Sequence, residues 1–136
     1  MARQRYSEAR IILPVPVEPA HTRALEAAEA ALVAAFGGFT RQAASGAWRD
    51  DSGCIIREGV YVYDIAVPLL SGSGEDADRE WAGAMTQLRI IAMTAAQKMQ
   101  QQCVYLRSPI GRVHLITPDG RDYNPDTEQH PYPRVR

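Results

Sequence analysis

The residues of this sequence whose types could do chemistry gather between positions 39 and 58. Trp48 and Arg57 fall near the same end of two segments that are expected to pair, so an aromatic ring and a guanidinium would lie close together. An aromatic face for stacking beside a guanidinium for phosphate is typical of a nucleotide site. The predicted ligand-binding residues, with their neighbours on the same expected sheet, are Phe39, Thr40, Trp48, Arg49, Arg57, Glu58, Tyr61 and Arg107.

Each residue of this group has an expected role, and a structural alternative stays open beside it. Trp48 would stack on the ligand, Arg49 and Arg57 would contact its anionic oxygens, and Thr40 would donate a hydrogen bond. In the alternative, Trp48 fills the edge of the core together with Phe39, and Arg57 is solvated like the neighbouring Glu58. Residue types and spacing do not separate these two interpretations.

Asp64 is a carboxylate in an unusual setting, because it interrupts an apolar strand. Such a group could be buried with a raised pKa and act as a base. It could also pair with an arginine of a neighbouring strand, such as Arg107, and we favour the pair. Tyr61, Tyr63 and Tyr105 would line the same sheet, where a ligand or a second subunit would meet them.

The cysteines and histidines predict no metal site. Cys54 and Cys103 form neither a CxxC motif nor a disulfide framework, and no pair of histidines has metal-ligand spacing. His114 alternates with apolar neighbours and is predicted to be structural. A nucleophilic pair of Cys103 with His114 is conceivable across a hairpin, but no third group supports it. We expect no metal and no catalytic residue.

A glycine-rich segment, Ser71-Gly72-Ser73-Gly74, precedes a long helical pattern. Such loops can hold phosphate on backbone amides, but this one lacks the lysine of a P-loop and the full dinucleotide fingerprint. Acidic residues follow it directly and would repel a phosphate. The segment is therefore predicted to be a linker, and no cofactor is expected.

Hydrophobic periodicity predicts the elements that would position these residues. Strands show alternation and helices show spacings of three and four. The expected strands cover 10–17, 39–48, 54–67, 103–106 and 113–116, and the expected helices cover 21–36 and 76–102. Pro14 and Pro16 suggest that the first strand lies at an edge or loses its pairing toward its end. The tail from 117 carries several prolines and should lack regular structure.

This element order predicts an α+β fold. Strand, helix, strand, strand, helix, strand is the split β-α-β pattern of a ferredoxin-like βαββαβ sandwich, with an antiparallel sheet and two helices on one face. A short extra strand follows. The predicted organisation is a ferredoxin-like domain over 1–116 and an irregular tail over 117–136.

The uncovered face of such a sheet predicts self-association. The bare face would present a set such as Ile12, Val60 and Val62, or Tyr61, Tyr63 and Ile65, and both sets are apolar. Shielding four such side chains from water is worth roughly 6–12 kcal/mol. We therefore expect a homo-oligomer, a dimer or higher. A tail that folds back over the sheet of a monomer is the alternative.

Composition excludes several classes of protein. Of 136 residues, 46% are apolar and the net charge is −1, so the chain is neither a disordered tail nor strongly basic. Because the chain is not strongly basic, no binding to duplex nucleic acid is expected. No association with a membrane is expected either, because no apolar run approaches the roughly 18 residues of a membrane helix. With no secretory signal and no disulfide framework, a cytoplasmic location is predicted.

The motif Phe36-Gly37-Gly38-Phe39-Thr40, followed by Gly46-Ala47-Trp48 and by Arg57-Glu58, resembles a group of small, mostly uncharacterised bacterial and phage proteins. The element order is similar over 9–116, whereas the specific motif covers a short part of the chain. The resemblance implies a ferredoxin-like domain and brings no established chemistry. Phage proteins that bind nucleotide immune signals are similar only in size and style.

The function predicted from sequence is a non-enzymatic, oligomeric binding protein for a small anionic ligand of nucleotide-derived type, such as a phage-type sponge for immune signals. A small dimeric ferredoxin-like enzyme, of isomerase or cofactor-free oxygenase type, is the alternative. Asp64, His114 and the tyrosines would then act. A third possibility is an inhibitor that blocks another protein, which an exposed apolar patch would support.

Overall fold

The structure is a computed structural model, and it describes residues 5–49, 52–69 and 74–123. Its elements follow the order β1, α1, β2, β3, α2, β4, β5. The strands are β1 (Arg5–Pro14), β2 (Thr40–Arg49), β3 (Ile55–Leu69), β4 (Val104–Arg107) and β5 (Val113–Ile116). The helices are α1 (Pro19–Phe36) and α2 (Gly74–Lys98).

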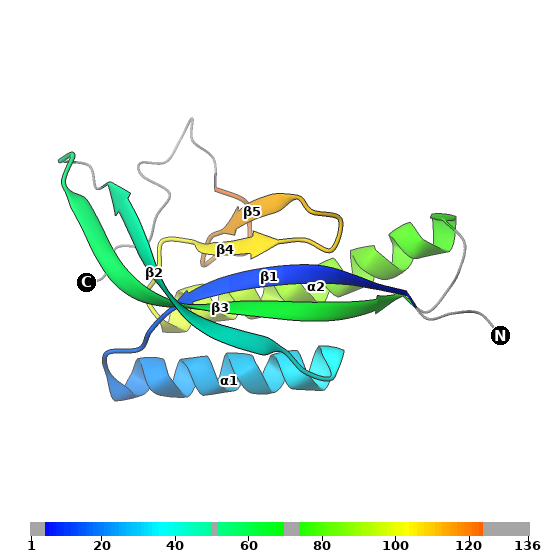
Figure 1. Cartoon of the computed structure of the whole chain (residues 1–136), viewed down its shortest axis with the longest axis horizontal. Helices are drawn as coiled ribbons and strands as arrows, with labels where there is room; N and C mark the ends of the chain where they lie inside the picture. Colours follow the sequence, from blue (N-terminus) through cyan, green and yellow to red (C-terminus); the bar gives the residue numbers. More distant parts are fainter. Residues whose placement is uncertain (1–4, 50–51, 70–73, 124–136) are drawn as a thin grey trace.

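The strands form one antiparallel sheet in the order β2-β3-β1-β4-β5. Both helices pack on the same face of this sheet (Figure 1). The predicted α+β sandwich with two helices on one face is therefore confirmed. The hairpin of β2 and β3 is the longest part of the sheet, and its far end curls away from the other strands.

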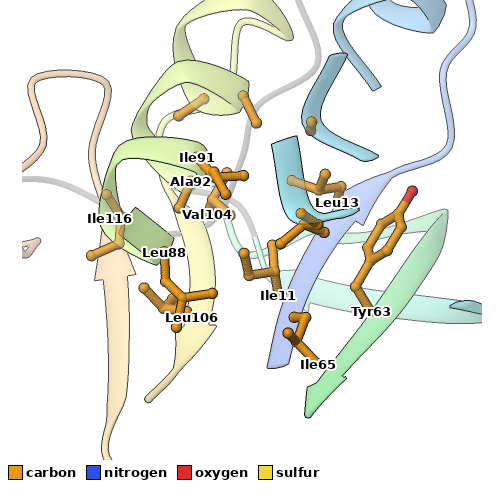
Figure 2. Close-up of a cluster of buried hydrophobic side chains, with 14 of the residues drawn as sticks. Ile11, Leu13, Tyr63, Ile65, Leu88, Ile91, Ala92, Val104, Leu106 and Ile116 are labelled. Carbon is orange, nitrogen blue, oxygen red and sulfur yellow. The ribbon is translucent and has the colours of Figure 1, made fainter. Parts of the chain in front are cut away.

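The core lies between the helices and the covered face of the sheet (Figure 2). Ile11 and Leu13 of β1 and Tyr63 and Ile65 of β3 are fully buried there, because alternate residues of a strand point to the same face. The helices contribute apolar residues at spacings of three and four, as the predicted periodicity requires. Those that are buried include Leu25, Ala28, Leu32, Leu88, Ala92, Ala95 and Met99.

Proline and glycine set the ends of α1, which begins two residues before the predicted position 21. Pro19 stands at its first turn, where its missing N–H costs nothing. Gly37 ends the helix in the left-handed conformation, with φ of 89°, and donates its N–H to the carbonyl of Val33. A residue with a side chain is strained there, so glycine is needed at this position.

The prediction for β1 was wrong at both ends. The strand begins at Arg5 and ends at Pro14, so Val15 and Val17 do not continue its buried face, and Val17 is 79% exposed. Proline cannot donate to the ladder, and the last bond at this end runs from the N–H of Val15 to the carbonyl of Gly59. β1 lies inside the sheet, so the prolines mark the end of its pairing and not an edge.

The second helix ends at Lys98, earlier than the predicted 102. Gln100 takes a positive φ of 55°, which breaks the helical repeat and turns the chain toward β4. Residues 117–123 are more ordered than predicted. The carbonyl of Thr117 accepts a hydrogen bond from the N–H of Gly120, and Ile116 forms an isolated β-bridge with Asp122. The rest of the predicted tail, and most of the predicted linker at 71–74, lie outside the described residues.

Candidate functional site

A cavity of about 260 Å³ opens on the face of the sheet that the helices leave bare. The pairing register puts the side chains of Ile12, Val62 and Tyr105 next to one another on this face. Two further apolar walls come from the hairpin and from the last strand. The principal lining residues are Ile12, Trp48, Val60, Val62, Tyr105 and Leu115.

Trp48 forms the wall of this cavity on β2, and Gly46 makes room for its ring. A Cβ atom placed on Gly46 would lie 2.8 Å from Cζ3 of Trp48, closer than real side chains approach. The two residues are two positions apart on one strand and therefore share a face. Gly46 thus allows the indole to lie against its own strand.

Glu58 is the charged residue among the described residues that line the cavity. It faces Gly46 across the hairpin and is half-buried. Burial raises the pKa of its carboxyl to about 7, because the charged form loses water without gaining a cation. The site therefore holds a carboxyl that exchanges its proton near neutral pH.

Gln101 adds a second polar group to the cavity from the connection between α2 and β4. It is 5% exposed, and its Nε2 donates to the carbonyl of Met99 at 3.0 Å. Its Oε1 is buried and has no hydrogen-bond partner among the described residues. Glu58 and Gln101 therefore both offer acceptor oxygens to the cavity, and a ligand with N–H or O–H donors would match them.

Trp48 and Glu58 are the predicted ligand-binding residues that the structure brings to one cavity. Arg57 pairs with Ala47, so it projects from the opposite face of the hairpin from Trp48, and it is exposed. Arg49 is exposed on the same side as Arg57. Thr40 shares the face of Trp48 but lies at the other end of β2. The expected placement of Trp48 with Arg49 and Arg57 on one face of the hairpin therefore does not occur.

Phe39 and Tyr61 belong to the side of the sheet that the helices cover. Phe39 meets the ring of Tyr63 edge-on, with ring centroids 5.2 Å apart. The guanidinium of Arg41 lies over the ring of Tyr61, 4.3 Å from its centroid. Phe39 is partly buried against the core, as the structural alternative for this residue predicts. Tyr61 is likewise partly buried against the core.

The predicted ion pair of Asp64 is confirmed, but its partner is Arg10. Nε of Arg10 lies 2.7 Å from the carboxylate of Asp64, and the carboxylate raises the pKa of the guanidinium. Arg107 pairs instead with Glu8, at 3.3 Å. These pairs cover the bare face beside the cavity, and Arg107 is not among the cavity's lining residues.

His114 is held by Asp122, whose carboxylate lies 3.0 Å from its Nδ1. Burial by itself would raise the pKa of Asp122, but hydrogen bonds from His114 and Arg89 lower it below its ordinary value. Cys103 is buried and lines the cavity described above. Within residues 5–49, 52–69 and 74–123, no group of three or more His, Cys, Asp or Glu side chains could hold a metal ion.

Sequence reasoning missed Gln101 as a site residue. The polar run at the end of the long helical pattern carried no signal of its own, since glutamine is common on helix surfaces. Gln101 is buried at the same cavity as Glu58 because α2 ends at Lys98 and the connection to β4 follows directly. Ile12, Val60 and Val62 were named as one possible bare face, and they line the cavity.

Comparison with known proteins gives one informative match. No protein-family model matches the chain, and no curated protein matches it. Among solved structures, a phage SAM lyase in complex with S-methyl-5'-thioadenosine is similar, with a TM-score of 0.54 and 17% sequence identity. The match covers 82% of this chain and 89% of that chain. At this identity the likeness shows a shared fold.

Within the described residues, no helix combines the length and the apolar character that crossing a membrane requires.

Proposed function

We propose that this protein binds a small nucleotide-derived ligand, of the adenosine thioether class, in the cavity between Trp48, Glu58 and Tyr105. The observation that carries the proposal is the composition of this cavity. Flat aromatic and aliphatic walls suit a nucleobase, and two acceptor groups suit the amino and hydroxyl donors of a nucleoside. The similar fold of a phage SAM lyase that binds S-methyl-5'-thioadenosine supports the choice of ligand class.

The charge of the cavity favours an uncharged or cationic ligand over the anionic ligand that the sequence predicts. No arginine or lysine stands among its described lining residues, and Glu58 adds a carboxyl. A phosphate there would meet no cation and would lie near a group that is partly negative at neutral pH. The proposed ligand is therefore uncharged or cationic.

Isothermal titration calorimetry tests the proposal directly. We expect S-methyl-5'-thioadenosine or S-adenosylmethionine to bind, and cyclic nucleotides and nicotinamide nucleotides to bind more weakly. Trp48→Ala should reduce affinity about tenfold or more, because base stacking on an aromatic ring is worth about 1–3 kcal/mol. Ile55→Ala is the matched control, since Ile55 lies on the same hairpin and is 65% exposed.

Two outcomes would contradict the proposed site. Equal affinity of Trp48→Ala and the unchanged protein would remove the cavity as the binding site. Binding of phosphorylated ligands that is lost in an Arg49→Ala, Arg57→Ala double variant would place the ligand on the opposite face of the hairpin. The anionic ligand expected from the sequence would then be correct.

Cleavage of a sulfonium ligand is a second candidate function, and the carboxyl of Glu58 favours it. When a C–S⁺ bond breaks, sulfur keeps the bonding pair and leaves as a neutral thioether, and the other fragment must lose a proton or be closed by its own carboxylate. A carboxyl with a pKa near 7 suits proton transfer.

Incubation with S-adenosylmethionine tests this second function. Release of S-methyl-5'-thioadenosine, measured by chromatography with mass analysis of the second product, would make the protein an enzyme. Intact S-adenosylmethionine recovered from its complex with the protein would leave it a binding protein. Glu58→Gln should slow the release if Glu58 transfers the proton, whereas Glu26→Gln, an exposed change on α1, should not.

A further inference from the structure

A second cavity, of about 270 Å³, adjoins the first. Pro14, Glu58 and Gln101 line both cavities, so Glu58 stands at the boundary between them. Val15 and Val17 of the connection between β1 and α1 form one wall of the second cavity. A ligand that fills the first cavity therefore has a neighbouring space into which a substituent can extend.

The polar side chains that line this second cavity are those of His21, Glu58, Gln100 and Gln101. Glu58 contributes its carboxyl, and Oε1 of Gln101 has no hydrogen-bond partner among the described residues. His21 is 8% exposed, and its Nε2 lies 3.2 Å from the carboxylate of Glu18, so its donor is already directed to a partner. No arginine or lysine is among the described lining residues.

Resting on the proposed function, we propose that the ligand passes the carboxyl of Glu58 and places an amine-bearing substituent in the second cavity. An ammonium group would donate to the carboxylate of Glu58 and to Oε1 of Gln101, in surroundings that strengthen a charged hydrogen bond. A substituent that ends in a carboxylate would meet like charge at Glu58 and no lysine or arginine. The favoured class is a nucleoside thioether or sulfonium with an aminoalkyl chain.

A series of thioethers tests this at pH 8, where Glu58 is charged. The ligands are 5'-deoxyadenosines that carry methylthio, propylthio, 3-aminopropylthio or 3-carboxypropylthio groups, and their affinities are measured by calorimetry. We expect the aminopropyl compound to bind about tenfold more tightly than the propyl compound, the gain of a hydrogen bond to a charged group. The carboxypropyl compound should bind more weakly than both.

Variants locate the substituent. Val17→Trp would obstruct the second cavity, and because Val17 is 79% exposed the change should leave the fold intact. It should abolish the gain of the aminopropyl compound and leave the methylthio compound unaffected. Val33→Trp, at an exposed valine of α1, is the matched control and should keep the gain. Glu58→Gln should reduce the gain.

The outcomes separate this inference from the proposed function. If the methylthio compound binds but the aminopropyl group brings no gain, or if Val17→Trp keeps the gain, the second cavity does not hold the substituent and only this inference fails. If no compound of the series binds, the proposed function fails and this inference fails with it.

Discussion

Glu58 is the residue on which the electrostatics of the candidate site depend. Its carboxyl is half-buried in an apolar cavity, and its pKa is raised to about 7 by the loss of water. In the unfolded chain the pKa of this carboxyl would be about 4.3. A group whose pKa is higher in the folded state takes up a proton on folding, so its burial costs least at low pH.

The sign of this linkage gives a prediction about pH. The free energy of unfolding should decrease as pH rises from about 4.3 to about 7, on the order of 1 kcal/mol because the carboxyl is only partly buried. Glu58→Gln should remove this decrease. Urea unfolding measured at several pH values in the protein, in Glu58→Gln and in the control Glu26→Gln would show it. A Glu58→Gln profile parallel to that of the unchanged protein would contradict the shift.

Gly46 and Trp48 give a second prediction at the scale of residues. Gly46→Ala would place Cβ against the indole of Trp48, so the ring must move. We expect a loss of about 1–3 kcal/mol in the free energy of unfolding, a changed tryptophan fluorescence and weaker ligand binding. Gly83→Ala is the control, because nothing lies within 4 Å of its Cβ position. Unchanged fluorescence and affinity in Gly46→Ala would show that the ring does not depend on Gly46.

At the scale of elements, Glu29 joins α1 to two strands. Its carboxylate accepts a hydrogen bond from the hydroxyl of Tyr63 at 2.6 Å and from Nη1 of Arg41 at 2.8 Å. Tyr63 is fully buried, and burial together with Glu29 raises the pKa of its hydroxyl. The contact therefore fixes the helix over the hairpin whose far end forms the cavity.

Breaking this contact should destabilise the fold. Glu29→Ala leaves the buried hydroxyl of Tyr63 without its acceptor, which should cost about 1–3 kcal/mol. In Tyr63→Phe the same glutamate change should cost clearly less, because no hydroxyl is left unpaired. Chemical unfolding of both single variants and the double variant gives the coupling energy. Additive effects would mean that the hydroxyl does not depend on Glu29 for stability.

At the scale of the whole molecule, the helices cover one face of the sheet and leave the other face bare. The bare face has two parts. Ile12, Val62 and Tyr105 lie at the cavity, and the ion pair of Arg10 with Asp64 lies beside it. Burying the apolar part against a second copy would be favourable, and self-association remains a prediction from the sequence.

Sedimentation tests self-association. We expect a mass above the 15.0 kDa of one chain. Val113→Glu should weaken the association, because Val113 pairs with Arg107 on the bare face and is 52% exposed. Val33→Glu, on the helical side, is the control. A single 15.0 kDa species of the unchanged protein at high concentration would contradict the prediction.

The fold and part of the site could be predicted from the sequence, because both depend on local pattern. Alternation placed Ile11 and Leu13 on one face, helical spacing placed Leu88 and Ala92 toward the sheet, and Pro19 and Gly37 gave the ends of α1. The hairpin of β2 and β3 was also expected, and Trp48 and Glu58, both among the predicted residues, line one cavity on it.

Only the tertiary structure decided which of the candidate residues meet. Side chains of a strand alternate with a period of two, so the register of β2 with β3 determines whether two neighbours share a face. Here Trp48 pairs with Ile56, and Arg57 pairs with Ala47. The indole ring and the guanidinium therefore project from opposite faces of the hairpin. Gln101 joined the site only because α2 ends at Lys98 and the connection to β4 places it at the cavity. Local pattern specifies each element, but register and the path of connections specify which side chains converge.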